Sequence, residues 1–155
     1  MQSTVTILKK AVRSGTYASI ASTLLLLIRG IPDCGSAIAP VNAVSHWLWK
    51  EKAIYKQSSS VRYSASGYCI HHAASIFWAM LYEKWATRSR KPPTPTNTLT
   101  RAAAVSSIAC LVDMQCTPER LTPGFERRLS RKSLLMVYAA FGLGLALHTL
   151  LDRRR

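Results

Sequence analysis

Four long stretches without Lys, Arg, Asp or Glu constrain this chain more than any other feature of its sequence. They cover residues 14–28, 64–82, 102–112 and 133–151, and charged residues gather between them. A surface helix of a water-soluble protein needs a polar stripe toward solvent, and runs this free of charge leave little room for one. The pattern predicts an all-α fold, a four-helix transmembrane bundle forming one domain over residues 1–155.

We predict transmembrane spans at about residues 14–29, 64–84, 101–116 and 133–151. The last span is the strongest, because at about 1.5 Å per residue it approaches a hydrocarbon core of roughly 30 Å and has basic residues at both ends. The second span ends in aromatic residues typical of a membrane interface. The first and third are short for a perpendicular crossing, and the third must also tolerate Asp113 within the membrane.

Two alternatives fit parts of the same pattern. A secretory signal would explain the basic residues before the first apolar run and the small residues Ala37 and Ala39, although Pro40 directly after them disfavours cleavage. A soluble four-helix bundle would explain the mean hydropathy of only +0.07 and the many Ser and Ala residues. We prefer the membrane interpretation because the runs lack a polar face.

The chain is strongly basic, with a formal charge of +14 from 21 Lys and Arg against 7 Asp and Glu. Such a charge suits either nucleic acid or an anionic membrane surface. A nucleic-acid binder gathers basic side chains on one face, whereas here they flank apolar stretches. This placement favours a lipid bilayer with anionic headgroups as the partner over nucleic acid. Helix packing would also allow another membrane protein or self-association.

Four crossings would place 11 Lys and Arg on the side of the two termini and 10 on the other side. The positive-inside rule compares these two numbers to orient a membrane protein. Their near equality leaves the orientation open, with only a slight preference for both termini inside.

The connections between the spans differ in character. Residues 37–49 are apolar and end in Trp47 and Trp49 beside charged residues, which fits either a short re-entrant or interfacial segment or a buried helix. Residues 88–97 are rich in Pro and basic residues and predict an extended linker. Thr-Pro pairs at 117–118 and 122–123 predict short helices before the fourth span.

Ionisable residues inside membrane spans are costly and are therefore candidates for function. Antiparallel crossing places His46, His72, Asp113 and Asp33 on one side of the membrane, which makes them a candidate polar cluster. Glu83 and His148 fall on the opposite side as a second candidate pair. Each group could be a structural hydrogen bond, part of a proton relay or part of a metal site. On the second span a stripe at three- and four-residue spacing is predicted to face other helices, and it consists of Tyr68, His72, Ser75, Ala79 and Tyr82. His71 is expected to point away from this stripe.

No known metal or catalytic motif is legible. The sequence has no CxxC, no HExxH and no His pair at i and i+4, so it gives little support for a metal site, which stays open, and it predicts no cofactor. No catalytic residue is predicted either, since no phosphate-binding loop and no arrangement of Ser, His and acid is present. The four cysteines could pair only in an oxidising compartment, and Cys110, in mid-span, is expected to be a packed thiol.

Three segments resemble a group of uncharacterised small multi-span membrane proteins of proteobacteria. They are residues 35–47 (GSAIAPVNAVSHW), 67–78 (GYCIHHAASIFW) and 120–126 (RLTPGFE). The resemblance implies the bacterial inner membrane as the location and implies no activity. We therefore expect an accessory or interaction protein that acts through helix packing, with a small transporter or a proton- or metal-handling protein as the alternative.

Overall fold

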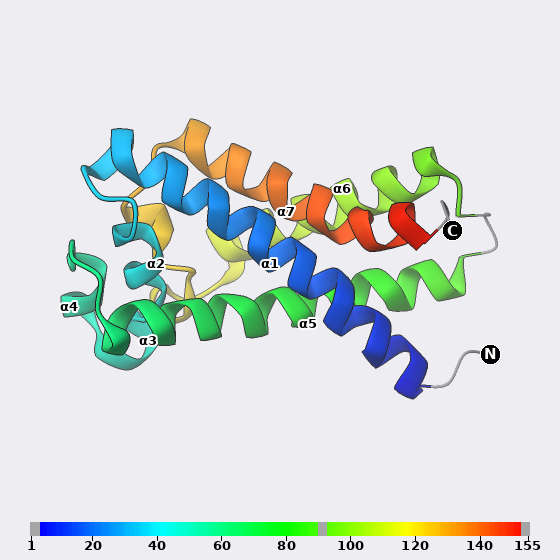
Figure 1. The fold of residues 1–155 in the computed structure, drawn as a ribbon, viewed down its shortest axis with the longest axis horizontal. Helices are drawn as coiled ribbons and strands as arrows, with labels where there is room; N and C mark the ends of the chain where they lie inside the picture. Colours follow the sequence, from blue (N-terminus) through cyan, green and yellow to red (C-terminus); the bar gives the residue numbers. More distant parts are fainter. Residues whose placement is uncertain (1–3, 90–92, 153–155) are drawn as a thin grey trace.

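The computed structural model describes residues 4–89 and 93–152, and these residues form helices, turns and loops without any strand. The prediction of an all-α chain is confirmed. Four long helices run along the molecule: α1 (Thr4–Cys34), α5 (Ser66–Arg88), α6 (Pro95–Leu111) and α7 (Arg131–Asp152) (Figure 1). The short helices α2 (Ala39–Val44), α3 (His46–Trp49) and α4 (Glu51–Ile54) gather at one end, which we call the connection end. The helix ends at Thr4 and Asp152 lie at the other, the terminal end.

The helix boundaries depart from the predicted spans at several points. The first helix is 31 residues long, and the second begins with a π-helical turn, η1 (Val61–Ala65). The third helix starts at Pro95 because the Thr94 side chain accepts a hydrogen bond from the Asn97 backbone N–H at 3.2 Å. The predicted linker at residues 88–97 is therefore shorter than expected, and its residues 90–92 lie outside the described part of the chain.

After α6 the chain continues through a second π-helical turn and two short 3₁₀ helices. These are η2 (Val112–Cys116), η3 (Glu119–Leu121) and η4 (Phe125–Arg127). The short helices expected after the two Thr-Pro pairs are therefore present, each as a single 3₁₀ turn.

The long helices approach one another closely because their contact faces carry small residues. The buried face of α1 consists of Ala, Ser and Gly apart from one leucine: Ala11, Ser14, Gly15, Ala18, Ser19, Ser22, Leu26 and Gly30. A Cβ atom added at Gly144 of α7 would lie 2.7 Å from the Ala18 nitrogen, and one added at Gly15 would lie 2.8 Å from the Ile76 Cα of α5. Small side chains therefore hold both neighbours of α1 at backbone contact, a packing mode common in membrane bundles.

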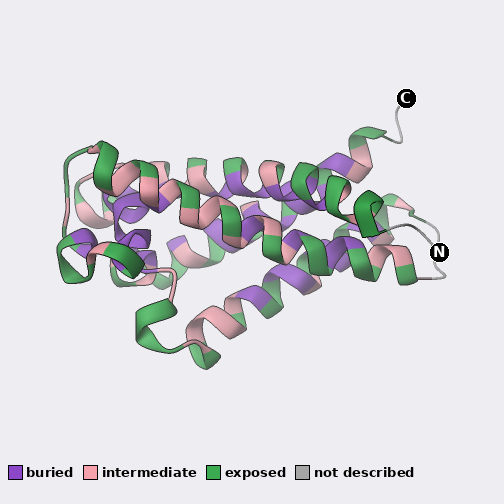
Figure 2. Ribbon diagram, turned by 90° about the horizontal axis from the view of Figure 1, so that it is seen from below, coloured by how far each residue is buried: buried purple, intermediate pink, exposed green. Residues whose placement is uncertain are grey.

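The outward face of α1 is apolar from Tyr17 onward, whereas the basic residues Lys9 and Arg13 are exposed near the start of the helix. The apolar row consists of exposed large side chains at helical spacing: Tyr17, Ile20, Leu24, Ile28 and Ile31. Val5, Leu8 and Val12 are also exposed, but on another side of the first turns. The long helices keep their buried residues on their inward sides, as Figure 2 shows. On α1 the usual order of a soluble protein is thus reversed, with small and polar residues inside and large apolar residues outside.

Two helices, α1 and α7, are long and apolar enough to cross a membrane. Within residues 4–89 and 93–152, α5 and α6 do not reach the same combination of length and hydropathy. The reason is visible in their sequences, since α5 carries two histidines, Glu83 and Lys84, and α6 is only 17 residues long and rich in Thr and Ser. Composition therefore supports two of the four predicted spans.

The short helix α2 is buried on all sides at the connection end. All six of its residues are buried. Three glycines in other segments of the chain allow those segments to approach α2 closely. A Cβ atom at Gly67 or Gly124 would overlap the backbone oxygens of Val41 or Ala43, and Gly30 packs against Pro40 in the same way. The part of this region that forms α2 is thus a buried helix, whereas Trp47 and Leu48 of α3 are exposed.

Asn42 joins α2 to the loop that follows α4 through side-chain hydrogen bonds. Its side-chain amide donates to the backbone oxygens of Lys56 at 2.9 Å and Ser58 at 3.1 Å, and its Oδ1 accepts from the Ser64 hydroxyl at 2.7 Å. The side chain is fully buried and uses three of its four hydrogen-bonding positions. The loop between α4 and α5 is therefore held by this amide and also by the Ser36 hydroxyl, which donates to the Gln57 backbone oxygen at 2.6 Å.

Candidate functional site

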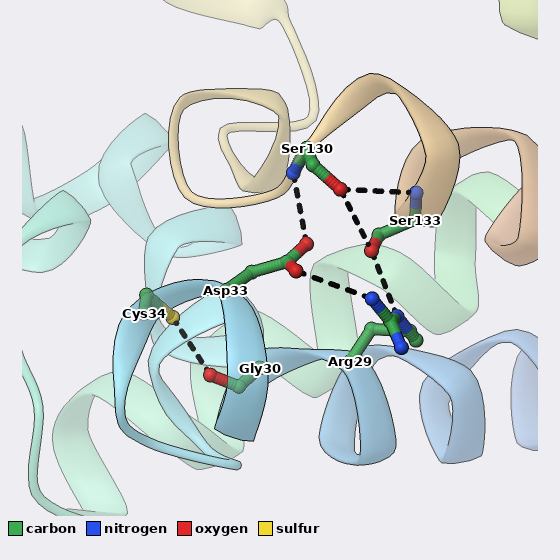
Figure 3. A network of polar contacts seen from close by, with 6 residues as sticks. All are labelled: Arg29, Gly30, Asp33, Cys34, Ser130 and Ser133. Atoms are coloured by element: carbon green, nitrogen blue, oxygen red, sulfur yellow. Dashed lines mark hydrogen bonds and ion pairs between the residues drawn. The ribbon is translucent and has the colours of Figure 1, made fainter.

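Asp33, at the end of α1, belongs to a polar network that joins α1 to the start of α7 (Figure 3). Its Oδ2 accepts from the Ser130 backbone N–H at 2.9 Å, and its Oδ1 lies 3.3 Å from the Arg29 guanidinium. Arg29 also donates from Nε to the Ser133 hydroxyl at 2.8 Å. Hydrogen bonds from Ser133 and from the Ser130 backbone hold the pKa of Asp33 below its usual value. The arrangement is that of a structural clamp.

This clamp predicts a pH-dependent contribution to stability. Because the pKa of Asp33 is lower in the folded chain, its contribution is complete above the ordinary aspartate pKa of about 4 and is lost as pH falls through the lower folded value. We expect Asp33→Asn to reduce the free energy of unfolding by about 1 to 2 kcal/mol at pH 7 and by less near pH 3. Thermal unfolding at both pH values measures this. Glu119→Gln, at a carboxylate that is 94% exposed, is the control, and an equal loss at both pH values would contradict the prediction.

His46 is buried and faces backbone oxygens. Its Nδ1 lies 2.9 Å from the Ala43 oxygen and its Nε2 lies 3.4 Å from the Glu119 oxygen. The ring therefore bridges α3 and η3 at the connection end, and neither nitrogen is directed at the other residues of the predicted cluster.

The two neighbouring histidines of α5 differ from the expectation. His72 stacks on Tyr68 with ring centroids 5.8 Å apart, and its Nδ1 is buried without a hydrogen-bond partner among the described residues. His71, which was expected to point away, has its Nε2 2.8 Å from the Ser22 hydroxyl of α1 and packs its ring edge-on against Phe125. His71 is thus the histidine that joins α5 to α1.

Asp113 lines a cavity in the side of the bundle. The Tyr138 hydroxyl of α7 donates to its Oδ2 at 2.7 Å. The cavity has a volume of about 510 Å³ and is lined by α5, by α6 with η2, by α7 and by the loop that carries Phe125. Both polar pairs, Asp113 with Tyr138 and His71 with Ser22, are part of its lining. A volume of this size is in the range of small-molecule sites.

The second candidate pair lies toward the terminal end of the bundle. Glu83 is 4% exposed, its Oε1 has no hydrogen-bond partner among the described residues, and His148 and Lys10 are close enough for their charges to act on it. The His148 Nε2 lies 3.3 Å from Asp152 Oδ2. The structure therefore brings Glu83 and His148 into one buried polar region.

The four residues of the first predicted cluster have separate partners. Asp33 contacts Arg29 and Ser130, His46 faces backbone oxygens, and only Asp113 lines the cavity. In residues 4–89 and 93–152 no group of three or more His, Cys, Asp or Glu is placed to hold a metal ion. The four cysteines, all described, are unpaired in this structure.

Sequence reasoning missed three side chains that shape the cavity. Ser22, Phe125 and Tyr138 come from three different segments and meet His71 or Asp113 only in the folded chain. The one signal for Tyr138 was its position, as the single tyrosine within the uncharged run at residues 133–151.

The sequence matches no protein-family model, and no curated protein or solved structure was found to be similar to the chain. Function is therefore inferred from the geometry of the bundle.

Proposed function

We propose that this chain is a multi-pass integral membrane protein of the bacterial inner membrane, acting as an accessory or interaction protein through helix packing. The observation that carries the proposal is the reversed polarity of α1. Its inner face consists of small and partly polar residues, while its outer face is a row of large apolar residues from Tyr17 to Ile31, preceded by the exposed basic residues Lys9 and Arg13. In water this row would be an unusually large exposed apolar patch, whereas in a bilayer it is the surface that lipid requires.

The proposal includes four crossings, although α5 and α6 are less apolar than α1 and α7. Both weaker helices also direct large apolar residues outward, such as Phe77 and Leu81 on α5 and Ile108 and Leu111 on α6. Four crossings agree with the position of Thr4 and Asp152 at one end of the bundle (Figure 1). Basic residues at both ends would meet anionic headgroups, which supports the bilayer as a partner.

The interaction role is supported by how the polar residues are used. Asp33, His46 and Asn42 each contact a residue in another segment of the chain, namely Ser130, Glu119 and Lys56. Each of the three therefore contributes to assembly of the bundle. The exposed helix faces would then be free to contact lipid, another membrane protein or a second copy of the chain.

A lysine on the outer face of α1 tests the membrane proposal. Ile20→Lys places a charge in the middle of the apolar row, which in a bilayer costs about 2.5 to 3.5 kcal/mol. We expect the parent chain to stay in the membrane pellet after carbonate and high-salt washing, with reporters on both termini on one side, and the variant to be depleted from that pellet. The control is Val61→Lys, because Val61 is 87% exposed and lies at the connection end.

Release of the parent chain into the wash would contradict the membrane proposal. Unchanged recovery of Ile20→Lys would contradict it too, since an exposed lysine is harmless in a soluble protein. Reporters on opposite sides would contradict four crossings while leaving membrane insertion in place.

A transporter or a proton-handling protein is the second candidate. It is supported by Asp113, which lies in the cavity wall with a tyrosine as its hydrogen-bond donor and has no ion pair among those of the described residues. A carboxylate placed in this way within a membrane is a common element of proton and ion pathways.

A further inference from the structure

We infer that the cavity beside α5 binds a lipophilic organic cation, an onium or ammonium group carried on an apolar body. The inference goes beyond the interaction role, and it does not require the chain to cross a membrane. It follows from the composition of the cavity wall, from the charge of Asp113 and from the way the cavity opens.

The wall of the cavity is aromatic. Trp47, Phe77, Trp78, Phe125, Tyr138 and Phe141 all line it, together with small apolar residues such as Ala73 and Ala109. Aromatic faces attract organic cations through the ring quadrupole, most strongly where water is excluded. An apolar body would at the same time bury its surface against these rings.

The charge of the wall is negative, in contrast to the chain as a whole. Among the described residues that line the cavity, Asp113 is the one of the Asp, Glu, Lys and Arg types, although Lys and Arg outnumber acids 21 to 7 in the sequence. Glu126 is close enough for its charge to act on Asp113, and its Oε2 is buried without a hydrogen-bond partner among the described residues. Asp113 takes part in none of the ion pairs found among the described residues. A cation would supply the missing counter-charge.

Two hydrogen-bonded pairs fix the shape of the site. Tyr138 holds Asp113, Ser22 holds His71, and Phe125 packs against both rings, with centroids 6.3 Å from Tyr138 and 6.2 Å from His71. These contacts connect α1, α5, η2, α7 and η4 at the cavity. The carboxylate and the aromatic wall are therefore positioned before any ligand arrives, which lowers the entropic cost of binding.

The cavity opens sideways, between the long helices. Phe77 is 52% exposed and Ala73 is also exposed, and both belong to the lining. An apolar cation could enter from the flank of the bundle, which in a bilayer would be the lipid side. Such an entrance favours a lipophilic cation over a small hydrated one.

Tetraphenylphosphonium and tetraphenylborate are suitable probes because they share one shape and differ in the sign of their charge. We expect the purified full-length chain in mild detergent to bind the phosphonium in equilibrium dialysis and to quench tryptophan fluorescence on binding, since Trp47 and Trp78 line the site. Asp113→Asn should weaken phosphonium binding at least about tenfold and leave borate binding equal or tighter. Glu119→Gln, at an exposed carboxylate outside the cavity, should change neither.

A second variant keeps the test independent of Asp113. Ala73→Phe adds bulk at an exposed position of the lining, so it should fold normally, retain the carboxylate and still reduce phosphonium binding at least about tenfold. Circular dichroism would establish that each variant is folded. Phosphonium binding that is absent, or that persists unchanged in either folded variant, would overturn the inference.

Added lipid distinguishes two sources of the cation. Phosphatidylethanolamine carries an ammonium headgroup, whereas phosphatidylglycerol does not. Displacement of the phosphonium by the first lipid and not by the second would identify a lipid headgroup as the occupant. Binding that resists both lipids would identify a free organic cation, and displacement by both equally would overturn the charge-based inference. Because this assay does not use membrane fractionation, its failure would be distinct from failure of the membrane proposal.

Discussion

Gly144→Leu is expected to reduce the free energy of unfolding by about 3 kcal/mol, because the leucine side chain would occupy the place where the backbones of α1 and α7 are in contact. The first added carbon already overlaps the backbone of Ala18, and that backbone is part of a long helix that cannot yield locally. The two helices must then separate along their contact face, which opens packing between residues on both sides. Unfolding of the purified chain by denaturant, followed by circular dichroism, measures the loss.

The matched control for this variant is Ala139→Leu. It also adds bulk to a small residue of α7, but at an exposed position. We expect a change within about 0.5 kcal/mol, typical of surface positions. If both variants lose the same stability, close approach at Gly144 is not what holds α7 against α1.

Asn42→Leu is expected to have a comparable effect, a loss of about 3 kcal/mol, for a different reason. The leucine has the same number of side-chain heavy atoms and the same branching, but it leaves the backbone oxygens of Lys56 and Ser58 and the Ser64 hydroxyl without their partner on Asn42. Each unmade bond carries a penalty of about 1 to 3 kcal/mol, offset in part where water can enter. Denaturant unfolding measures the total, and proteolysis should show faster cleavage between α4 and α5.

Gln57→Leu serves as the comparison for Asn42→Leu. This side chain is exposed and lies in the same loop, so the same change of an amide to leucine should leave stability and cleavage nearly unchanged. Unaltered cleavage in Asn42→Leu would show that the loop is held by contacts other than the amide.

The helices could be predicted from the sequence because their cause is local. Stretches without charge, bounded by Lys and Arg, mark each long helix, and the Thr-Pro pairs mark the turns before α7. The small-residue faces were also legible, since Ser75, Ala79 and Tyr82 of the predicted stripe on α5 are buried. Spacing along one helix is enough to define such a face.

The cavity could not be predicted because it depends on how helices cross. The predicted stripe of α5 runs through His72, yet near its start the helix turns His71 toward Ser22. A straight helix has 3.6 residues per turn, so the side that touches a neighbour drifts along its length when two helices cross at an angle. Gly15 and the other close contacts of α1 determine how α1 lies against α5. The spacing of residues along α5 alone carries no information about these contacts. Likewise, nothing local to Asp113 indicates Tyr138, which lies 25 residues away.

The buried position of α2 has a consequence for the order of assembly. The three glycines that enclose it are residues 30, 67 and 124, so its binding site is complete only after most of the chain has been synthesised. Until then the bundle is incomplete, and the apolar surfaces of α2 and of the tryptophans of α3 remain uncovered. Closure of the connection end is thus a late event in biogenesis, and chains truncated before residue 124 should expose this segment to chaperones and proteases.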